Sequence, residues 1–206
     1  MGVAIRTADE RDRELVVRLL DDAFQDDPVS GWIFPDPADR RVTHPVLVGA
    51  ILDIVLAEGR VDLAEDGSAC ALWLPMPADG HPEAGEGDVH GDEGDDAVRL
   101  REAIDPDNER IELLVRLTEE IHPSGSAHEY LWMIAVAPDS QCQGLGAAIL
   151  QHALDRCDRE GVAAYLEASS ARSSKLYERL GFDHLGSPLD FPDGPRMWPM
   201  WREPRA

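Results

Sequence analysis

The spacing of apolar residues predicts a strand and a helix at the start of the chain. Residues 3–7 are typical of a short strand, and Thr7 or Asp9 is placed to cap the helix that follows. Its apolar positions recur every three or four residues, as on one face of a helix. They are Leu15, Val16, Leu19, Leu20, Ala23 and Phe24. Asp, Pro and Gly residues between Asp26 and Pro37 then break the pattern, which predicts a loop.

The same reasoning predicts three more elements before the middle of the chain. A helix is expected to start after Pro45 and to run to about Glu58. Residues 60–64 and 69–74 are expected to pair as a hairpin around Asp66-Gly67, a favoured turn dipeptide. A further helix is expected over about 107–121, with apolar residues on one side.

The second half alternates strands with helices. Residues 130–136 are apolar at alternating positions of both faces, which indicates a central strand covered on both sides. A glycine-rich turn and a helix follow, then a strand at 163–166 and a helix from about 173 to 180, which Gly181 is placed to end. Strands near 182–185 and 196–201 complete the pattern.

Length and composition indicate one domain with an insertion. The chain has 206 residues, close to the size of a single domain, so we expect one domain over 1–206. Residues 75–97 contain eight acids, no Lys or Arg, and many Gly and Pro. Such a segment buries too little apolar surface to fold by itself, which predicts a flexible surface loop. His81 and His90 lie in it at a spacing that matches no metal-ligand pattern, so no metal is expected.

The charge restricts the partners. With 19 basic and 41 acidic residues, the formal net charge is −22, which disfavours nucleic acid and anionic membranes as partners. A cationic small molecule suits the charge better. The sequence has no apolar run of the roughly 18–20 residues that a membrane span needs, and the N-terminus does not resemble a signal peptide. Together with three widely spaced cysteines, these features favour a cytoplasmic location. A homodimer is left open.

The turn between the strand at 130–136 and its helix is a candidate anion site. Unpaired backbone N–H groups point outward at the start of a helix, and the helix dipole adds positive partial charge. Gly144 and Gly146 lack a Cβ and so permit a close approach. The spacing is neither that of a nucleotide-triphosphate loop nor that of a dinucleotide fingerprint. Taken alone, the glycines are also compatible with tight helix–strand packing.

Two linked motifs carry a family resemblance. The run VAPDSQCQGLG at 136–146 resembles the acetyl-CoA motif of the GNAT superfamily of N-acetyltransferases. The segments LEAS at 166–169 and LYERLGF at 176–182 resemble the second motif of that superfamily, at the matching distance downstream. These segments and the tail DGPRMWPM at 193–200 are also similar to puromycin N-acetyltransferase-like members. The strong similarity covers about 128–201.

The resemblance implies an α/β (α+β) fold with a mixed, mostly antiparallel sheet, splayed at the strand 130–136 and flanked by helices. Acetyl-CoA would lie in the gap as cosubstrate, with no metal. Its pantetheine arm would pair with the backbone of Ile134, Ala135 and Val136. Its pyrophosphate would lie on the amides of the turn. The other predicted contacts are Gln141, Cys142, Gln143, Gly144, Leu145, Gly146, Ala147 and Ser173. Many relatives carry Arg where this chain has Gln141 and Gln143, and often Asn where it has Ser173.

The resemblance also assigns catalytic roles. Tyr177 matches the tyrosine that acts as general acid toward the departing thiolate, and an unperturbed tyrosine keeps its proton at neutral pH. Glu167 is the candidate base, directly or through water, at a strand end that faces the gap. His128, Glu129 and Tyr130 are rival or accessory groups, and alternation places His128 and Tyr130 on one strand face with Glu129 on the other.

We expect an acetyl-CoA-dependent N-acetyltransferase that acts, by direct attack in a ternary complex, on a primary amine of a small molecule, antibiotic-like amines included. The residues expected to contact that substrate are Trp32, Phe34, Trp73 and Tyr130. A non-catalytic acyl-CoA-binding module and a protein or peptide N-acetyltransferase are the alternatives. The sequence names neither the amine nor the oligomeric state.

Overall fold

The structure is a computed structural model that describes residues 3–78 and 93–205. One mixed sheet runs through it in the order β1-β2-β3-β4-β5-β8-β6, with β7 paired to β8. The strands are β1 Ile5–Thr7, β2 Arg60–Ala64, β3 Ala69–Met76, β4 His128–Val136, β5 Ala163–Ala168, β6 Asp183–His184, β7 Leu189–Asp190 and β8 Arg196–Arg202. The helices are α1 Arg13–Phe24, α2 Pro28–Ile33, α3 Pro37–Glu58, α4 Glu93–Ile104, α5 Glu109–Ile121, α6 Leu145–Glu160 and α7 Ala171–Arg179. Among the described residues, no helix combines the length and the apolarity that crossing a bilayer requires.

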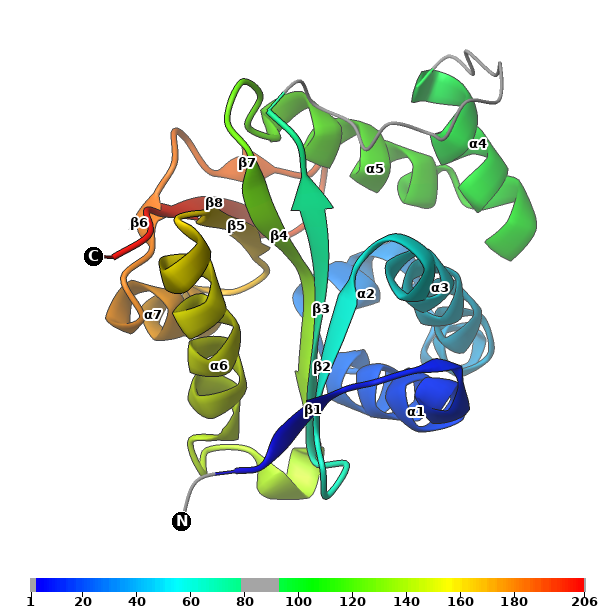
Figure 1. The fold of residues 1–206 in the computed structure, drawn as a ribbon. Coiled ribbons are helices and arrows are strands. Elements are labelled where there is room, and N and C mark those ends of the chain that lie inside the picture. Colours follow the sequence, from blue (N-terminus) through cyan, green and yellow to red (C-terminus); the bar gives the residue numbers. More distant parts are fainter. Residues whose placement is uncertain (1–2, 79–92, 206) are drawn as a thin grey trace.

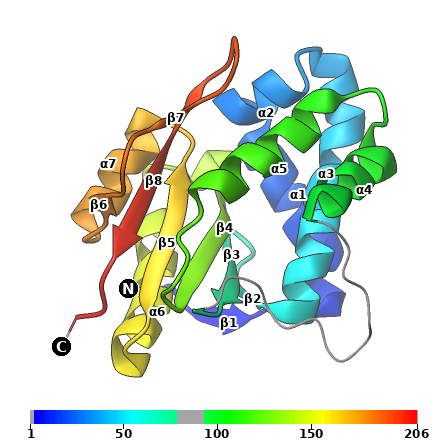
Figure 2. The ribbon, with the colours of Figure 1, turned by 90° about the horizontal axis from the view of Figure 1, so that it is seen from above.

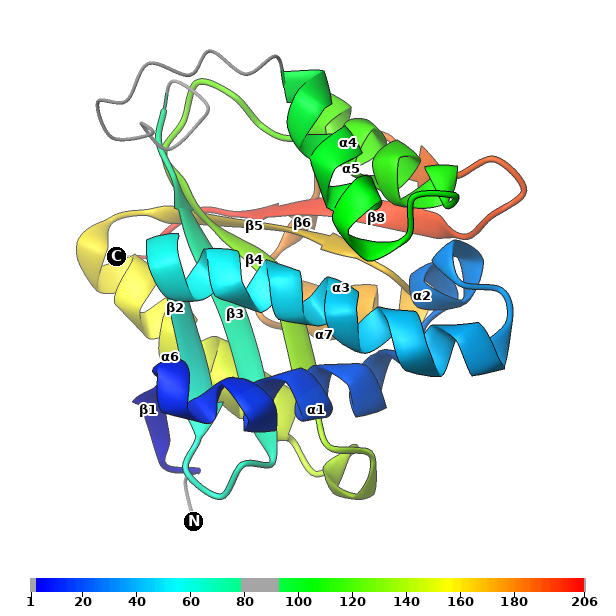
Figure 3. The same ribbon diagram turned by 90° about the vertical axis from the view of Figure 1, so that its right-hand side faces the viewer.

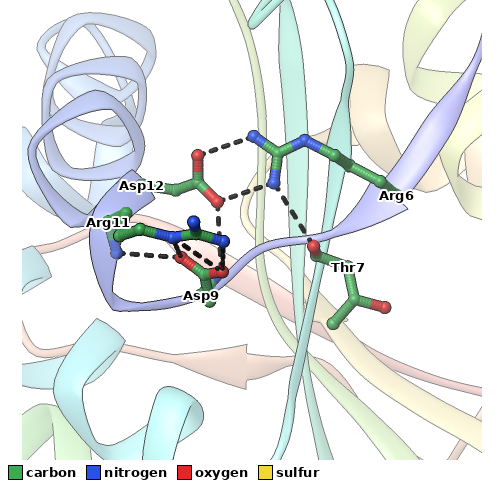
Figure 4. A network of polar contacts seen from close by, with 5 residues as sticks. All are labelled: Arg6, Thr7, Asp9, Arg11 and Asp12. Atoms are coloured by element: carbon green, nitrogen blue, oxygen red, sulfur yellow. Dashed lines mark hydrogen bonds and ion pairs between the residues drawn. The ribbon is translucent and has the colours of Figure 1, made fainter.

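A compact polar network turns the chain from β1 into α1 (Figure 4). The Arg6 guanidinium donates to both carboxylate oxygens of Asp12 at 2.7 and 2.6 Å. Asp12 also accepts the backbone N–H of Asp9, as part of a capping box between Asp9 and Asp12, and Asp9 accepts the backbone N–H of Arg11. Asp9 therefore caps the short 3-10 turn at Glu10–Asp12 and not, as predicted, α1 itself, whose N-cap residue is Asp12.

The region between α1 and β2 is more helical than the sequence pattern predicts. The expected loop contains α2, because Asp27 caps it through two backbone N–H groups and Pro28 supplies a helix-compatible φ at the first position. The next helix begins at Pro37 rather than after Pro45, since Asp36 caps it in the same way. Pro45 lies inside α3, where tertiary packing of the apolar face outweighs the lost backbone hydrogen bond.

Helices cover both faces of the sheet (Figures 1 and 3). Helices α1, α2 and α3 pack on one face, and their core includes Val16, Leu20, Val48, Leu52, Leu72 and Met133. Helices α6 and α7 pack on the other face, with Trp73, Leu131, Leu150, Leu154, Leu166 and Phe182. Strands β3 and β4 contribute side chains to both cores, as the apolar run at 130–136 predicts.

The sheet opens between β4 and β5. These two strands pair in parallel only over His128–Tyr130 and Ala163–Tyr165, whereas β4 stays paired with β3 as far as Val136. Strand β5 continues beside β8 instead (Figure 2). The splayed, mostly antiparallel sheet implied by the family resemblance is therefore confirmed.

The segment predicted as an acidic loop is shorter than 75–97. Its first two residues belong to β3, and α4 begins at Glu93. Residues 79–92, with His81 and His90, lie outside the described residues, so the prediction for them is not tested. The sequence pattern does not predict the helix at 93–104, because acidic residues dominate its start and its apolar positions lie farther along. One of them, Leu100, packs on the α1–α3 core.

Candidate active site

The loop before α6 presents an anion-binding geometry. Cys142 has a φ of 62° and Gly144 a φ of 85°, so two left-handed residues lie two positions apart at the helix start. Alternation of this kind turns successive backbone N–H groups toward one concave side. Gly144 is the N-cap of α6 and has no side chain to satisfy those groups. Arg172 of α7 donates a 2.9 Å hydrogen bond to the Cys142 sulfur, which brings a positive charge to the same loop.

The glutamines of the loop hold its backbone. Gln143 donates to the Asp139 carbonyl at 3.2 Å, and Gln141 donates to the Val136 carbonyl at 3.4 Å. Neither side chain replaces the arginine charge of many relatives. Backbone N–H donors, the positive end of the α6 dipole and the Arg172 guanidinium are therefore the features of this loop that favour a diphosphate.

The free edge of β4 leads from this loop into the molecule. Past Tyr130, no strand among the described residues pairs with this edge, because β5 has diverged. Ile134 and Val136 turn their side chains toward the α6 core, and Ala135 lies against the α1–α3 core. An open strand edge that ends in an amide-lined loop fits a pantetheine arm joined to a diphosphate, because the arm carries amides that pair like an added strand.

A cavity of about 480 Å³ lies where the sheet opens. Ligand sites for small molecules usually enclose about 300–1,000 Å³. Most of its wall is apolar and includes Val48, Ile51, Leu114, Trp132, Met133 and Ile134. The described residues that line it include three acids, Asp27, Glu119 and Glu167, and no Arg or Lys. The cavity therefore suits an apolar body that carries a positive charge.

A bulge in β4 shapes this wall. The register with β3 shifts between Leu72 and Trp73, whose partners are Met133 and Leu131, so Trp132 is the extra residue. Consecutive Trp132 and Met133 consequently pack toward the α1–α3 core, whereas alternation would separate them. Trp132 keeps the ordinary alternation with Tyr130, and their ring centroids lie 6.2 Å apart with planes at 26°. The bulge turns the side chain of Met133 toward the same core as Trp132.

Glu167 lies at the end of β5 and lines the cavity. The Tyr130 hydroxyl donates to its Oε2 at 2.9 Å. Tyr165 is close to the same carboxyl, but Tyr165 Oη and Glu167 Oε1 are both buried without a hydrogen-bond partner among the described residues. Burial raises the pKa of the Glu167 carboxyl to about 7, against the opposing effect of the nearby hydroxyls. A carboxyl with this pKa exchanges protons near neutral pH, as a general base must.

Tyr177 enters the cavity from α7 and is 5% exposed. Its ring packs edge-on against Phe182. Burial raises the pKa of Tyr177 above its ordinary value, and the negative charge of Asp27 raises it further. Proton donation from Tyr177 to a thiolate could be eased by a lowered tyrosine pKa or by a hydrogen bond that forms in the transition state. The raised pKa of Tyr177 excludes the first of these. Burial also raises the pKa of a thiol, so a hydrogen bond in the transition state is sufficient.

Asp27 is a site residue that the sequence analysis missed. Its Oδ1 accepts the N–H groups of Val29 and Ser30, and its Oδ2 accepts the Ser169 hydroxyl at 2.6 Å. Asp27, Ser30 and Ser169 all line the cavity. Burial raises the pKa of Asp27. A helix-capping signal before Pro28 is present in the sequence, but only the fold brings it to the end of β5.

Of the four residues predicted to contact the substrate, Tyr130 lines the cavity and the other three lie elsewhere. Trp32 is buried against Phe191 and donates to the Pro192 carbonyl at 3.1 Å. Phe34 is buried edge-on against His44. Trp73 is fully buried in the core beneath α6, on the other face of the sheet. The fold uses these three large rings for packing.

Two of the three rival groups, His128 and Glu129, do not line the cavity. The alternation along β4 is as predicted: Glu129 faces Arg156 of α6, 3.9 Å away, while His128 lies on the Tyr130 face. His128 Nδ1 donates to the Ser126 carbonyl at 2.8 Å, and its Nε2 lies 3.0 Å from Nε2 of His122. His122 lines the cavity, whereas His128 and Glu129 do not.

Ser173 has a structural partner within the chain. Its N–H and hydroxyl form a capping box with Ser170 at the start of α7. Its predicted contact with the cosubstrate stays a prediction.

The comparisons with known proteins agree with this geometry. Residues 106–182 match the acetyltransferase (GNAT) family model. A crystal structure from Corynebacterium glutamicum, described as histone acetyltransferase HPA2 and related acetyltransferase, covers 100% of this chain and 98% of its own, with a TM-score of 0.71 and 26% identity. The chain has the GNAT acetyltransferase fold. Within that fold, the matched segment runs from the start of α5 through β4, the amide-lined loop and α7.

Other similar proteins carry different acceptors in their names. A crystal structure of mosquito arylalkylamine N-acetyltransferase like 5b has a TM-score of 0.66 at 16% identity, and covers 98% of this chain and 100% of its own. Among curated proteins, the [ribosomal protein bS18]-alanine N-acetyltransferase of Escherichia coli is 52% identical over 56 residues, which are 26% of this chain. The match spans 38% of the length of that relative.

Proposed function

We propose that this protein is an acetyl-CoA-dependent N-acetyltransferase that acetylates a primary amine on a small, largely apolar molecule by direct attack. The observation that carries the proposal is the arrangement of three features in one opening of the sheet. The loop at 142–147 offers backbone donors, β4 offers a free edge, and the cavity beside them holds Glu167 and Tyr177. The GNAT match over 106–182 supports the cosubstrate.

The roles of the residues follow from their surroundings. Backbone amides of the loop and Arg172 would hold the diphosphate, and the β4 edge would align the pantetheine arm. Acetyl-CoA supplies the activated acetyl group when bound. Glu167, held by Tyr130, would attract the ammonium form of the substrate and take its first proton. Tyr177 would donate its proton to the sulfur as the C–S bond breaks.

The nature of the cavity favours a small amine over a peptide. Its wall is apolar apart from a few acids, and the stacked Tyr130 and Trp132 rings offer a flat surface to an aromatic or alkyl body. Puromycin-like amines and arylalkylamines both have this character. The curated relative named for a ribosomal protein supports an N-terminal alanine as the alternative acceptor.

The deciding experiment combines binding and turnover. Calorimetry with coenzyme A tests the binding site, and release of free thiol from acetyl-CoA is followed with arylalkylamines, puromycin, agmatine and a peptide with an N-terminal alanine. We expect coenzyme A to bind and the apolar amines to be acetylated. Absence of coenzyme A binding contradicts the proposal outright. Binding without turnover supports an acyl-CoA-binding module, and turnover of the peptide alone supports a protein acetyltransferase.

A further inference from the structure

A second hydrogen-bonded cluster lies on the α1–α3 side of the cavity, apart from Glu167. It consists of Asp21 on α1, His44 on α3 and Ser30 on α2, and we call it the Asp21–His44–Ser30 cluster. Asp21 Oδ1 lies 2.8 Å from His44 Nδ1, and His44 Nε2 lies 3.2 Å from the Ser30 hydroxyl. Ser30 and His44 line the cavity. Three helices thus place carboxylate, imidazole and hydroxyl in one line that ends at the cavity.

The surroundings of His44 fix its protonation. The residue is 1% exposed, and its ring lies between Phe24 and Phe34. Burial lowers the pKa of His44, an effect that Asp21 and Asp27 oppose and Arg40 reinforces. The neutral ring donates from Nδ1 to Asp21, so Nε2 carries the lone pair and accepts the Ser30 proton. The Ser30 oxygen keeps lone pairs for a donor inside the cavity.

Asp27 connects this cluster to the end of the cavity where Tyr177 lies. It accepts the Ser30 N–H at 3.3 Å and the Ser169 hydroxyl at 2.6 Å. Its charge also raises the pKa of Tyr177. Asp27 thus contacts Ser30 and acts electrostatically on Tyr177, and both of these residues line the cavity.

We propose that Ser30 is a further catalytic residue, which takes the second proton from the substrate nitrogen while its own proton passes to His44, held in position by Asp21. The inference rests on the proposed function. It answers a requirement of the chemistry: an ammonium substrate must lose two protons to become an amide, and Glu167 takes only the first.

In the attack, the nitrogen lone pair forms the N–C bond, and the π electrons of the thioester carbonyl move to its oxygen. The positively charged nitrogen then gives its proton to the Ser30 oxygen as the Ser30 proton moves to His44 Nε2, and Asp21 stabilises the imidazolium. The carbonyl re-forms, the C–S bond breaks, and the sulfur takes the Tyr177 proton. After product release, the protons on His44 and Glu167 leave to water and Tyr177 takes one proton from water, so one proton is released in each cycle.

The test compares Ser30→Ala, His44→Gln and Asp21→Asn with the wild type, on the amine that the panel identifies. We expect kcat to fall about 10- to 100-fold in each, because a positioned acid or base contributes at least this much. The Kd for coenzyme A and the KM for the amine should change less than about threefold. The rise of activity near pH 7, assigned to Glu167, should persist in all three variants.

Two further variants separate catalysis from structure. Ser30→Thr keeps the hydroxyl and should retain most of the activity, and Asp22→Asn changes the exposed neighbour of Asp21 and should behave like the wild type. Asp21→Asn preserves side-chain shape, so it decides the matter if the buried variants do not fold. Wild-type kcat in Ser30→Ala or Asp21→Asn, or loss of kcat in step with coenzyme A binding, overturns the relay alone. A wild type without turnover of any amine overturns the proposed function as well.

Discussion

At Glu167, burial and hydrogen bonding act on the same carboxyl in opposite directions. Burial raises its pKa to about 7, while the Tyr130 hydroxyl, 2.9 Å away, favours the ionised form. The balance leaves a group that both attracts a cation and accepts a proton near neutrality. Tyr177 differs, since burial and the Asp27 charge both raise its pKa and keep it protonated.

Glu167→Gln should remove the dependence of activity on pH near neutrality. Because the base must be ionised, wild-type activity should rise as pH increases through about 7, the pKa of Glu167. The variant should lose about 100-fold in kcat and show no rise in that range. Initial rates of thiol release between pH 5.5 and 8.5 measure this. Glu178→Gln is the control, since Glu178 pairs with His184 outside the cavity. An unchanged rise in Glu167→Gln would remove Glu167 from the proton transfer.

Tyr177→Phe should lower kcat more than it weakens binding of the cosubstrate. The ring keeps its packing against Phe182, and only the hydroxyl is lost. A loss of about 100-fold in kcat is expected from the missing proton donor, with the calorimetric Kd for coenzyme A nearly constant. Equal turnover by variant and wild type would exclude Tyr177 as the general acid.

Helix α6 has a glycine in the left-handed conformation at each of its ends. Gly144 begins it with a φ of 85°, and Gly161 ends it with a φ of 68°. An added Cβ would meet no atom within 4 Å at either position, so both glycines are required by backbone conformation rather than by space. Only the first end faces the opening of the sheet.

Gly144→Ala and Gly161→Ala therefore form a matched pair. Each forces an L-residue into a left-handed conformation and should cost about 1 kcal/mol of unfolding free energy, measured by urea titration. Gly144→Ala should in addition weaken coenzyme A binding about tenfold, because it distorts the amides of the loop. Gly161→Ala should bind as the wild type does. Equal affinities in the two variants would contradict the assignment of the loop to the diphosphate.

On the scale of the whole molecule, the site exists because two sheet segments diverge. Strand β4 belongs to the β1–β4 segment and β5 to the segment with β8, and they share only three residue pairs. The acid, the base and the amide-lined loop come from different elements around this opening. Its wall also takes residues from α2 and α3, which lie outside the segment that matches the family model.

Hydrogen–deuterium exchange should reveal this opening. Coenzyme A should slow exchange in peptides that cover 131–136 and 142–147, because it supplies partners for the free strand edge and the loop amides. A peptide over β2, paired on both sides by β1 and β3, should not change. Uniform protection of all three, or protection of none, would disagree with binding in the gap.

Elements with a strong local signal can be predicted from the amino-acid sequence alone. The hairpin at Asp66-Gly67, the buried strand β4, the glycine turn and α6 all follow from periodicity and turn chemistry, and the two linked motifs pointed to Tyr177 and Glu167. Local signals failed at α2, at the start of α3 and at α4. There, caps and tertiary packing outweighed the proline and acidic residues that suggested breaks.

Which side chains meet depends on how the folded elements pack against one another. The fold turned Trp32, Phe34 and Trp73 into packing residues, and it brought Asp27, Ser30 and His44 to the cavity that Glu167 and Tyr177 share. The register shift that turns Met133 to the same side of β4 as Trp132 has no local signature. The reason is physical: periodicity reports which face of an element is buried, but not what lies opposite. A cavity depends on elements distant in sequence that meet without filling the space between them.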